Sequence, residues 1–462
     1  MVSPFVGLET ERLNKWIEEK KMSKEDIIKE YVDRHDITQY KQGVDYYFKR
    51  NEIVKRNIYK YTNDGRKIID EDATNNRMAS GWHKLLVDQK VAYLFGQPLV
   101  FNSKTDDDSA VESVNEVLGD NFDDALPKLA TNASNKGREW LHPFVDDRGE
   151  FDYIVIPAEE GIPIYDNTNR KELIGFIRMY ELDDGTEKLE LWDDQTVTYY
   201  EYHNGNIVLD QSNGDAEQSH FEYNGTGYGW GYTPFVEFPN NDDRVSDLTF
   251  IKDYIDVYDK LIADGANTLE DIQEFLYVIR GYEGTDMAEA VTNLKRYKGV
   301  AVDSDGGGVD IRQGEMPINS LDSFLDRLSD NIFNFGMGVD VDSDKFGNSP
   351  SGVALKFLYS FLDMKASKME RKFSKAIRTF LWFVCEYISI AESKTIDYKD
   401  ITFTLNKTVI SNERDAVEMA QMSKGLVSDE TVWEMHPAVR DIETERKRIE
   451  QERPVRLSDE DE

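Results

Sequence analysis

GMGVDVDSDKFGNSPSG, residues 336 to 352, connects two stretches of helical sequence and decides how the chain is organised. Before it, apolar residues recur at helical spacing from Leu321 to Phe333, and after it they do so from Leu355 to Val384. This spacing predicts an amphipathic helix on each side. A connection of this length without helix or strand pattern is uncommon inside a compact domain and usually has a function. We therefore predict two helices joined by a loop, which the residues alone leave open between a functional element and an ordinary surface loop.

The sequence before this loop predicts an arm built from two helices. A long helix is expected from Val245 to Ile279, and a return helix from Leu321 to Phe335 with Asn319 as its N-cap. Residues 281 to 317, between them, contain a candidate short helix and a candidate β-hairpin at 299 to 313. Opposite its apolar stripe, the long helix carries an acidic face, whose candidate residues are Asp253, Asp256, Asp259 and Asp264.

The remaining sequence predicts both helices and strands. Residues 1 to 60 have a helical pattern, in which Ser23 and Asp26 form a capping box, and a further helix is expected from Asn75 to Phe95. From 139 to 240, short β-branched and aromatic runs alternate with turn residues, which predicts antiparallel strands. A strand is expected at 401 to 410 and charged helices at 413 to 452. The fold class is therefore α+β.

Four stretches together resemble one family. They are FGNSPSGVALKFLYSFLDMKA (346–366), NNRMASGWHKLLVDQKVAYLFGQPLVF (75–101), YDNTNRKELIGFIRMYE (165–181) and EFPNNDDRVSDLTFIKDYIDVYDKLIADGANTLED (237–271). In this order, they resemble the portal proteins of tailed bacteriophages, of the type found in long-tailed phages of Gram-positive hosts.

The resemblance implies a ring-forming subunit with named parts. It implies a mixed α/β wing at 1–244, a stem helix at 245–280, a clip at 281–318 and a second stem helix at 319–335. The tunnel loop would be 336–352, the long helix and return strand of the wing 353–412, and the crown with an acidic tail 413–462.

The same resemblance implies a function without catalysis. It implies a ring of about twelve subunits at one capsid vertex, closed by a heterologous interface. Double-stranded DNA is packaged and ejected through it without sequence specificity. The implied partners are other copies of the chain, the terminase large subunit, a head-completion or adaptor protein, and the scaffold and major capsid proteins. No cofactor, catalytic residue or membrane is implied. The expected location is the virion, with the host cytoplasm during assembly.

The net charge has two interpretations. Ninety acidic residues against 55 basic ones give a formal charge of -35, which argues against a protein that grips DNA through a basic patch. A channel wall that must let DNA slide would suit this charge, and so would an ordinary solubilising surface. The single cysteine, Cys385, lies in an apolar helical stretch, which predicts a buried structural thiol.

Three groups of residues are candidate interaction sites. The resemblance implies that the loop residues face DNA: Asp342, Asp344, Lys345, Phe346, Asn348 and Ser349. In the predicted clip, the candidate partner-binding residues are Lys295, Arg296 and Lys298, for which a solvated basic cluster is the alternative. The long helix carries a basic face comprising Lys365, Lys368, Arg371, Lys372 and Lys375. This face either follows DNA or pairs with acidic residues of the same or a neighbouring subunit, and we favour the pairing because an acidic assembly needs local compensation.

Two other classes of function stay open at this point. One is a metal-dependent nuclease that uses Asp340, Asp342 and Asp344, but the calcium-loop pattern fails because Lys345 replaces the glycine and Ser351 replaces the final glutamate. No metal site is therefore predicted. The other is a capsid or tail adaptor or scaffold protein that never contacts DNA.

Overall fold

The computed structural model describes residues 12–105, 108–169, 171–203, 205–212, 214–272, 276–280, 308–312, 318–340, 352–405, 407–408, 413–436, 438–439, 442, 445–446 and 448–449. The chain divides into two compact units. Unit 1 contains Met1–Ile37, Leu86–Ser246 and Met337–Glu462, and unit 2 contains Thr38–Leu85 and Asp247–Gly336. Helix α4 (Trp82–Phe95) spans the division in sequence.

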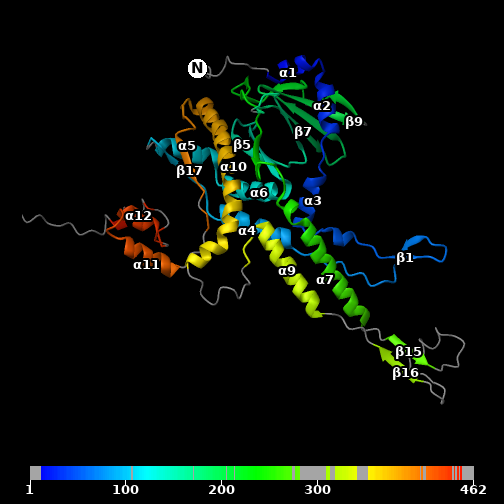
Figure 1. Cartoon of the computed structure of the whole chain (residues 1–462). Helices are drawn as coiled ribbons and strands as arrows, with labels where there is room; N and C mark the ends of the chain where they lie inside the picture. The colour runs from blue at the N-terminus through cyan, green and yellow to red at the C-terminus, as the bar shows by residue number, and fades with distance from the viewer. Residues whose placement is uncertain are drawn as a thin grey trace, which may run out of the picture. The chain divides into compact units, whose positions relative to one another are not determined.

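The largest sheet of unit 1 is an antiparallel meander with the strand order β10-β9-β8-β7-β6, in which β11 also pairs with β9 (Figure 1). Helices α1 (Arg12–Lys20) and α2 (Lys24–Asp33) contribute apolar side chains, including Leu13 and Ile27, to the core on this sheet. The strands are β6 (Gly161–Tyr165), β7 (Leu173–Glu181), β8 (Glu187–Trp192), β9 (Thr196–His203), β10 (Asn206–Leu209) and β11 (Glu217–Ser219).

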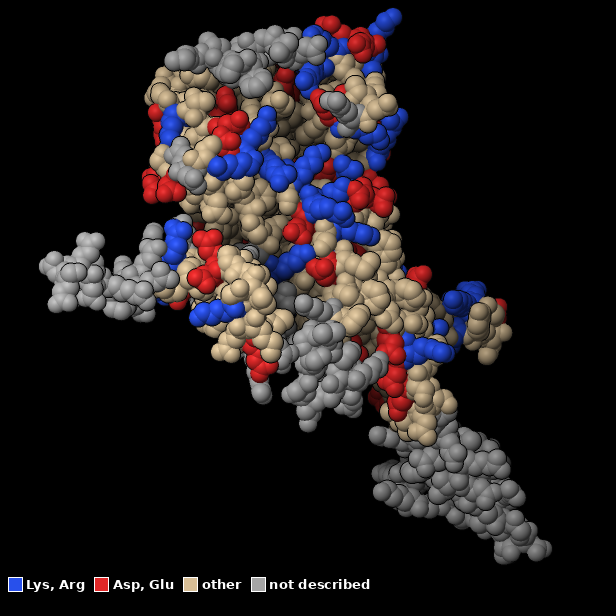
Figure 2. All heavy atoms as spheres, turned by 60° about the vertical axis from the view of Figure 1, so that its left-hand side comes forward, with Lys and Arg blue, Asp and Glu red and all other residues tan. Residues whose placement is uncertain are grey.

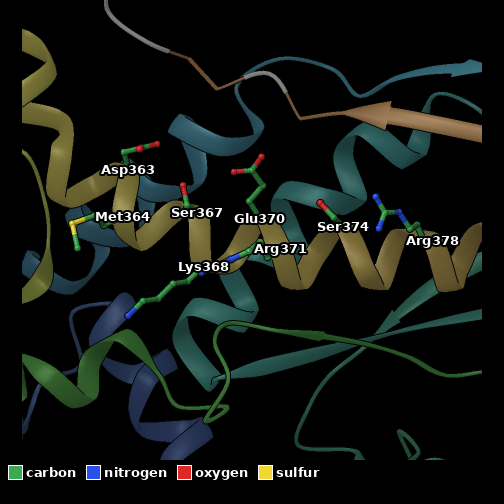
Figure 3. Close-up of a pocket in the computed structure, with 8 residues that line it drawn as sticks. All are labelled: Asp363, Met364, Ser367, Lys368, Glu370, Arg371, Ser374 and Arg378. Carbon is green, nitrogen blue, oxygen red and sulfur yellow. The ribbon is translucent and has the colours of Figure 1, made fainter.

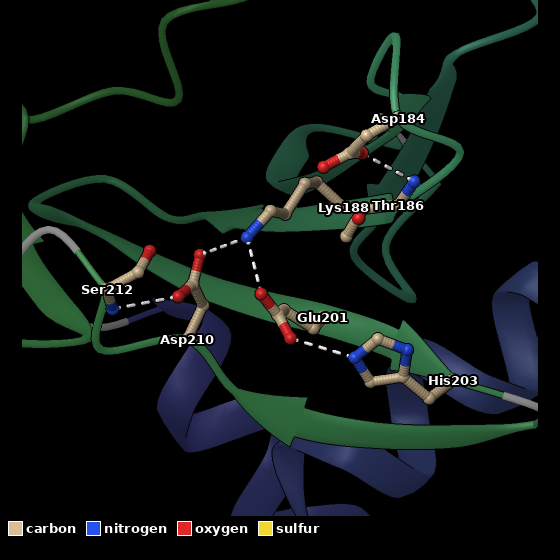
Figure 4. Close-up of polar contacts among 7 residues, drawn as sticks. All are labelled: Asp184, Thr186, Lys188, Glu201, His203, Asp210 and Ser212. Atoms are coloured by element: carbon tan, nitrogen blue, oxygen red, sulfur yellow. Dashed lines mark hydrogen bonds and ion pairs between the residues drawn. The ribbon is translucent and has the colours of Figure 1, made fainter.

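An ion-pair network joins three strands of this sheet (Figure 4). The Nζ atom of Lys188 on β8 lies 2.6 Å from a carboxylate oxygen of Glu201 on β9 and 2.8 Å from one of Asp210 after β10. Hydrogen bonds from Lys188 and Ser212 lower the pKa of Asp210 to about 2. The network links the edge strand β10 to β9 and β8.

A smaller antiparallel sheet of unit 1, with the order β14-β4-β5, packs against helices. Helix α10 is the longest of the described helices, and its Phe373 and Phe380 contact Phe238 and Phe122 at ring-centroid distances of 5.0 and 5.3 Å. The elements are β4 (Arg138–Val145), β5 (Phe151–Ile156), β14 (Val236–Pro239), α5 (Asp108–Leu118), α6 (Asn121–Lys136) and α10 (Gly352–Glu392).

Short elements complete unit 1. Strand β3 pairs with β17, and β12 pairs with β13, in both cases antiparallel. Cys385 of α10 is buried as predicted, and burial raises the pKa of its thiol to about 12. The elements are β3 (Val100–Ser103), β12 (Phe221–Tyr223), β13 (Thr226–Tyr228), β17 (Ile401–Thr404), α11 (Glu413–Ser423) and α12 (Asp429–Glu434).

Unit 2 is organised around helices α7 and α9, which pack together. The indole of Trp82 lies edge-on to Tyr258 of α7 and Phe333 of α9, with centroid distances of 5.5 and 5.3 Å. The elements of this unit are α3 (Thr38–Tyr47), η1 (Glu52–Lys55), β1 (Tyr59–Tyr61), β2 (Lys67–Ile69), η2 (Asp247–Phe250), α7 (Lys252–Ile272), β15 (Leu276–Arg280), β16 (Gly308–Arg312) and α9 (Ile318–Gly336).

Several sequence predictions of secondary structure are confirmed. Helices α9 and α10 flank the predicted loop, as the apolar spacing indicated. The capping box at Ser23 is present, because its side chain accepts a hydrogen bond from Asp26 N and the carboxylate of Asp26 accepts one from Ser23 N. The strands between 139 and 240 pair antiparallel throughout the described residues.

Other boundaries are wrong. Residues 276–280, expected at the end of the long helix, form β15 and pair with β16. Asn319 lies inside α9 rather than capping it, since that helix begins at Ile318. The helix expected from Asn75 begins at Trp82. Residues 38–85, which were assigned to the wing, cluster in unit 2 with the predicted stem helices, and the assignment of the wing itself stays a prediction. The candidate short helix within 281–317 lies outside the described residues.

Candidate functional site

Two of the four predicted acidic-face residues of α7 are hydrogen-bonded to the segment that precedes α4. Asp259 is only 1% exposed, and it accepts hydrogen bonds from Asn51 Nδ2 at 2.5 Å and Ser80 N at 2.8 Å. Burial raises its pKa. Asp264 forms an ion pair with Arg56. Both carboxylates thus hold residues 51–80 against α7 within unit 2.

The remaining two acidic-face residues, Asp256 and Asp253, differ in their contacts and exposure. Asp256 accepts hydrogen bonds from the hydroxyl of Tyr46 and, at 2.6 Å, from Nζ of Lys252. Burial, followed by this contact with Asp256, raises the pKa of Tyr46. Asp253 is exposed. Of the four predicted acidic-face residues, only Asp253 is exposed, while Asp256 and Asp264 are partly buried and Asp259 is buried. The role of this face stays a prediction.

Helix α9 carries an acidic stripe that the sequence analysis missed. Asp322, Asp326 and Asp330 are all exposed and follow one another at intervals of four residues. At about 100° per residue, this spacing aligns them along one side of the helix, which we call the α9 stripe. The middle of this side lies about 140° around the helix from the mean direction of the buried Leu328 and Ile332. The stripe is visible in the sequence LDSFLDRLSD (321–330), in which aspartates recur every four residues, but the sequence analysis followed only the recurrence of apolar residues.

The predicted basic face of α10 is largely exposed. Lys368, Arg371 and Lys375 are exposed, whereas Lys365 and Lys372 are partly buried. Figure 2 shows several basic side chains gathered on one face of the molecule. Lys372 forms an ion pair with Asp242, a residue of the same unit, and this contact lowers the pKa of Asp242. The predicted pairing of this basic face with acidic residues therefore occurs in part within the chain.

A hollow of about 680 Å³ runs along one side of α10 (Figure 3). Asp363 and Glu370 pair there with Lys407 at 2.8 and 3.0 Å, and Asp363 also accepts a hydrogen bond from Tyr93 at 3.1 Å. Burial and this bond raise the pKa of Tyr93 to about 12. The lining residues are Asp363, Met364, Ser367, Lys368, Glu370, Arg371, Ser374 and Arg378. The hollow is lined by hydroxyls, both signs of charge and the thioether of Met364.

The remaining predicted site residues lie outside the described part of the chain. These are the loop residues Asp342, Asp344, Lys345, Phe346, Asn348 and Ser349 and the clip residues Lys295, Arg296 and Lys298. Among the described residues, no group of three or more His, Cys, Asp or Glu side chains could hold a metal ion. No helix among them is long and apolar enough to cross a bilayer.

Comparison with known proteins identifies the family. The family described as phage portal protein, SPP1 Gp6-like, matches residues 27–454. The chain is 37% identical over 463 residues to the portal protein of Bacillus phage SPP1, covering 98% of this chain and 92% of the relative. It is 32% identical over 438 residues to the portal protein of Clostridium phage phiCD119, covering 90% and 93%.

The chain belongs to the phage portal protein family. A portal protein is a ring-forming structural component of the phage particle at a capsid vertex, and it is not an enzyme. The resemblance stated from four sequence stretches is confirmed. Family membership excludes the nuclease and adaptor alternatives. Among solved structures, a chain in the neck of an empty GTA particle is 11% identical with a TM-score of 0.45, covering 76% of this chain and 88% of that chain.

Proposed function

We propose that rings of this portal protein form the channel through which double-stranded DNA enters and leaves the capsid. Family membership supports the ring. The observation that carries the channel is the α9 stripe, in which Asp322, Asp326 and Asp330 are exposed along one side of a helix. We propose that this side of α9 faces the DNA.

The α9 stripe would keep DNA mobile because its carboxylates do not bind phosphates. A protein that neutralises phosphates with Lys or Arg releases counterions from DNA and gains affinity with each contact. Such contacts, repeated in every subunit of a ring, would hold the strand in place. Carboxylates repel the phosphates over a Debye length of about 8 Å at physiological salt, so the DNA keeps its own counterions and water and stays mobile.

Charge reversal of the stripe tests this proposal. We expect the triple variant Asp322→Lys, Asp326→Lys and Asp330→Lys to form rings but to package DNA at least about tenfold more slowly, because each ring gains a band of phosphate-binding cations. The measurement is DNase-protected DNA in proheads supplied with terminase and ATP, beside ring formation by negative-stain microscopy. The defect should weaken as salt is raised.

A matched control carries the same charge change elsewhere. The triple variant Glu112→Lys, Glu116→Lys and Asp120→Lys alters exposed acidic residues in and just after α5. It should package DNA like the wild-type chain. Equal packaging by both triple variants, at every salt concentration, would remove the α9 stripe from the channel wall.

The finer assignments extend the same proposal. We propose about twelve subunits per ring. The partners would be the terminase large subunit, a head-completion or adaptor protein, and the scaffold and major capsid proteins, with assembly in the host cytoplasm. Lys295, Arg296 and Lys298 would bind the motor or the adaptor. Lys345 and its neighbours in the 342–349 loop would contact the moving DNA, and the same packaging assay on Lys345→Asp addresses that role.

A further inference from the structure

Helix α10 carries an exposed surface that is apolar at its start and basic further along. Phe357, Phe361 and Met364 are 74%, 50% and 55% exposed. Lys368 and Arg371 follow them, and both are exposed. At about 100° per residue, these five side chains lie within a sector of about 80° around the helix axis. They therefore form one continuous surface, which we call the mixed α10 surface.

The positive charge of the mixed α10 surface is not neutralised by its neighbours. In the hollow beside it, the acids Asp363 and Glu370 are both paired with Lys407 (Figure 3). Neither Lys368 nor Arg371 forms an ion pair with any residue that the structure describes. A negatively charged group would therefore be attracted to this surface.

The two halves of the mixed α10 surface favour a protein rather than DNA as the occupant. DNA phosphates would pair with the cations but would leave Phe357 and Phe361 in water. A protein surface with an apolar side chain among carboxylates suits both halves. A second copy fits this description, because the family forms rings and each chain carries a net charge of -35. Ring closure brings two unlike surfaces of the chain together at each boundary.

The turn between β7 and β8 is a surface of the complementary kind. Leu182 is 41% exposed, and Glu181, Asp183 and Asp184 around it are exposed as well. Within the described part of the chain, Glu181 and Asp183 form no ion pair. Leu182 N donates to Thr186 O and Thr186 N donates to Asp184 Oδ1, both at 2.9 Å (Figure 4). A turn that is already ordered loses little conformational entropy on docking.

The position of the two surfaces suits a ring. Both belong to unit 1. Figure 1 shows α10 on one side of this unit, with the large sheet extending from there to β9 at the opposite edge. Strand β8, which follows the turn, lies next to β9 in that sheet. In a cyclic ring, one side of each subunit meets a different side of the next subunit.

We propose that the β7–β8 turn of each subunit docks on the mixed α10 surface of the neighbouring subunit, with Leu182 near Met364 and the carboxylates of the turn near Lys368 and Arg371. Met364 and Arg371 are about 10 Å apart along the helix, which suits a tight turn less than about 7 Å across. The proposal rests on ring formation, which belongs to the family, and not on the DNA channel proposed above.

A charge exchange across the boundary tests the contact. We expect Glu181→Lys with Asp183→Lys to raise the concentration for half-maximal ring assembly at least about tenfold, and Lys368→Glu with Arg371→Glu to do the same. The chain with all four substitutions should assemble within about threefold of the wild-type concentration, because opposite charges face each other again. Sedimentation at a fixed sodium chloride concentration measures assembly. Asp184 stays unchanged because it supports the turn.

Net charge alone predicts the opposite result for the turn variant. Glu181→Lys with Asp183→Lys makes the chain less acidic, so weaker repulsion between copies would strengthen assembly. Glu18→Lys with Glu19→Lys is the matched control, with the same charge change at two exposed residues of α1. It should assemble at the wild-type concentration or below it. Melting of the dilute chain checks the fold of each variant.

Two outcomes of the charge exchange would overturn the proposal. One is assembly of the turn variant at or below the wild-type concentration. The other is a chain with all four substitutions that assembles no better than the two double variants, because the two surfaces would then act independently.

Cysteine labelling examines the apolar half in rings that have formed. The thiol of Met364→Cys should react with a maleimide at least about tenfold more slowly in the ring than in the dilute chain, because Leu182 of the partner subunit covers it. Asn115→Cys, at an exposed position of α5, should react equally in both, and the native Cys385 is buried. Equal rates for Met364→Cys in the ring and in the dilute chain would refute the contact.

The outcomes separate this proposal from the proposed function. Neither assembly nor labelling involves DNA or terminase. Failure of the α9 stripe in the packaging assay would thus leave the docking of the β7–β8 turn standing, and failure of the charge exchange would leave the DNA channel standing.

Discussion

At the scale of single residues, two buried histidines set a pH dependence. His142 lies between the rings of Trp192 and Phe235, at centroid distances of 4.8 and 4.4 Å, and donates from Nδ1 to Pro234 O at 2.6 Å. His220 accepts a hydrogen bond from Trp230 N at 3.2 Å. Burial lowers the pKa of each to about 3. Both imidazoles are therefore neutral in the folded chain at every pH above this value.

This predicts a loss of stability in acid. Between pH 6.5 and about 3 the unfolded chain binds a proton at His142 that the folded chain does not, so the free energy of unfolding falls as the pH falls. From pH 7 to pH 5, this one group should remove about 2 kcal/mol. We expect His142→Gln to show a shallower decline of the melting temperature over this range than the wild-type chain.

An exposed histidine of the same unit gives the control. His203 is exposed and contacts Glu201 at 2.8 Å on the surface of the large sheet. His203→Gln should keep the steep decline of the wild-type chain. If His142→Gln and wild type decline in parallel between pH 7 and pH 5, burial of a neutral imidazole is not the cause.

Sequence reasoning at this scale recognised residue types but not their partners. It located the α7 carboxylates correctly on a helix, yet Asp259 is bonded to Asn51 and Ser80, which are far away in sequence. Helical spacing reports which side of a helix a residue occupies and not what packs against that side. The α9 stripe, in contrast, needed only the four-residue period of Asp322, Asp326 and Asp330, and could have been found.

At the scale of elements, Asp259 fastens α7 to the segment before α4. Replacing it with alanine leaves the donors Asn51 Nδ2 and Ser80 N buried without their acceptor. Losing the partner of a buried donor costs about 1–3 kcal/mol for each group, so we expect Asp259→Ala to destabilise unit 2 by roughly 2–4 kcal/mol. The measurement is urea unfolding of the dilute chain.

Asp253 provides the comparison on the same helix. Its side chain is exposed, and surface substitutions without buried partners usually change stability by less than about 0.5 kcal/mol. Asp253→Ala should therefore unfold with the wild-type midpoint. Equal midpoints for Asp259→Ala and Asp253→Ala would contradict the role given to Asp259.

The elements that were mispredicted depend on distant pairing. Residues 276–280 continue the apolar stripe of α7 and were assigned to that helix, but they pair as β15 with β16 at 308–312. Cross-strand pairing overrides local helical spacing when the partner strand supplies the hydrogen bonds. The helices around the 336–352 loop were predicted correctly because their apolar stripes are long and local spacing alone determines them.

At the scale of the whole molecule, net charge governs assembly. Each chain carries -35, so neighbouring subunits in a ring repel one another, and salt screens this repulsion over about 8–10 Å. The exposed cations of α10 on unit 1 include Lys368 and Arg371. A seam in which these cations meet acidic residues of a neighbour would reduce the repulsion where the subunits are closest.

Such a seam predicts that the effect of a charge substitution on ring assembly depends on its position as well as on its sign. We expect Lys368→Glu with Arg371→Glu to raise the concentration for half-maximal ring assembly about tenfold or more, because attraction across the seam becomes repulsion. Lys15→Glu with Lys29→Glu is the matched control, with the same change of net charge at exposed positions of α1 and α2. Sedimentation across a sodium chloride titration measures both. If only the net charge mattered, the concentration for half-maximal ring assembly would rise equally in both variants, and the difference from the wild-type chain would disappear at high salt. If α10 lies at a seam, the α10 variant assembles more weakly than the control at every intermediate salt concentration. Equal curves for the two variants would reject α10 as part of the subunit boundary.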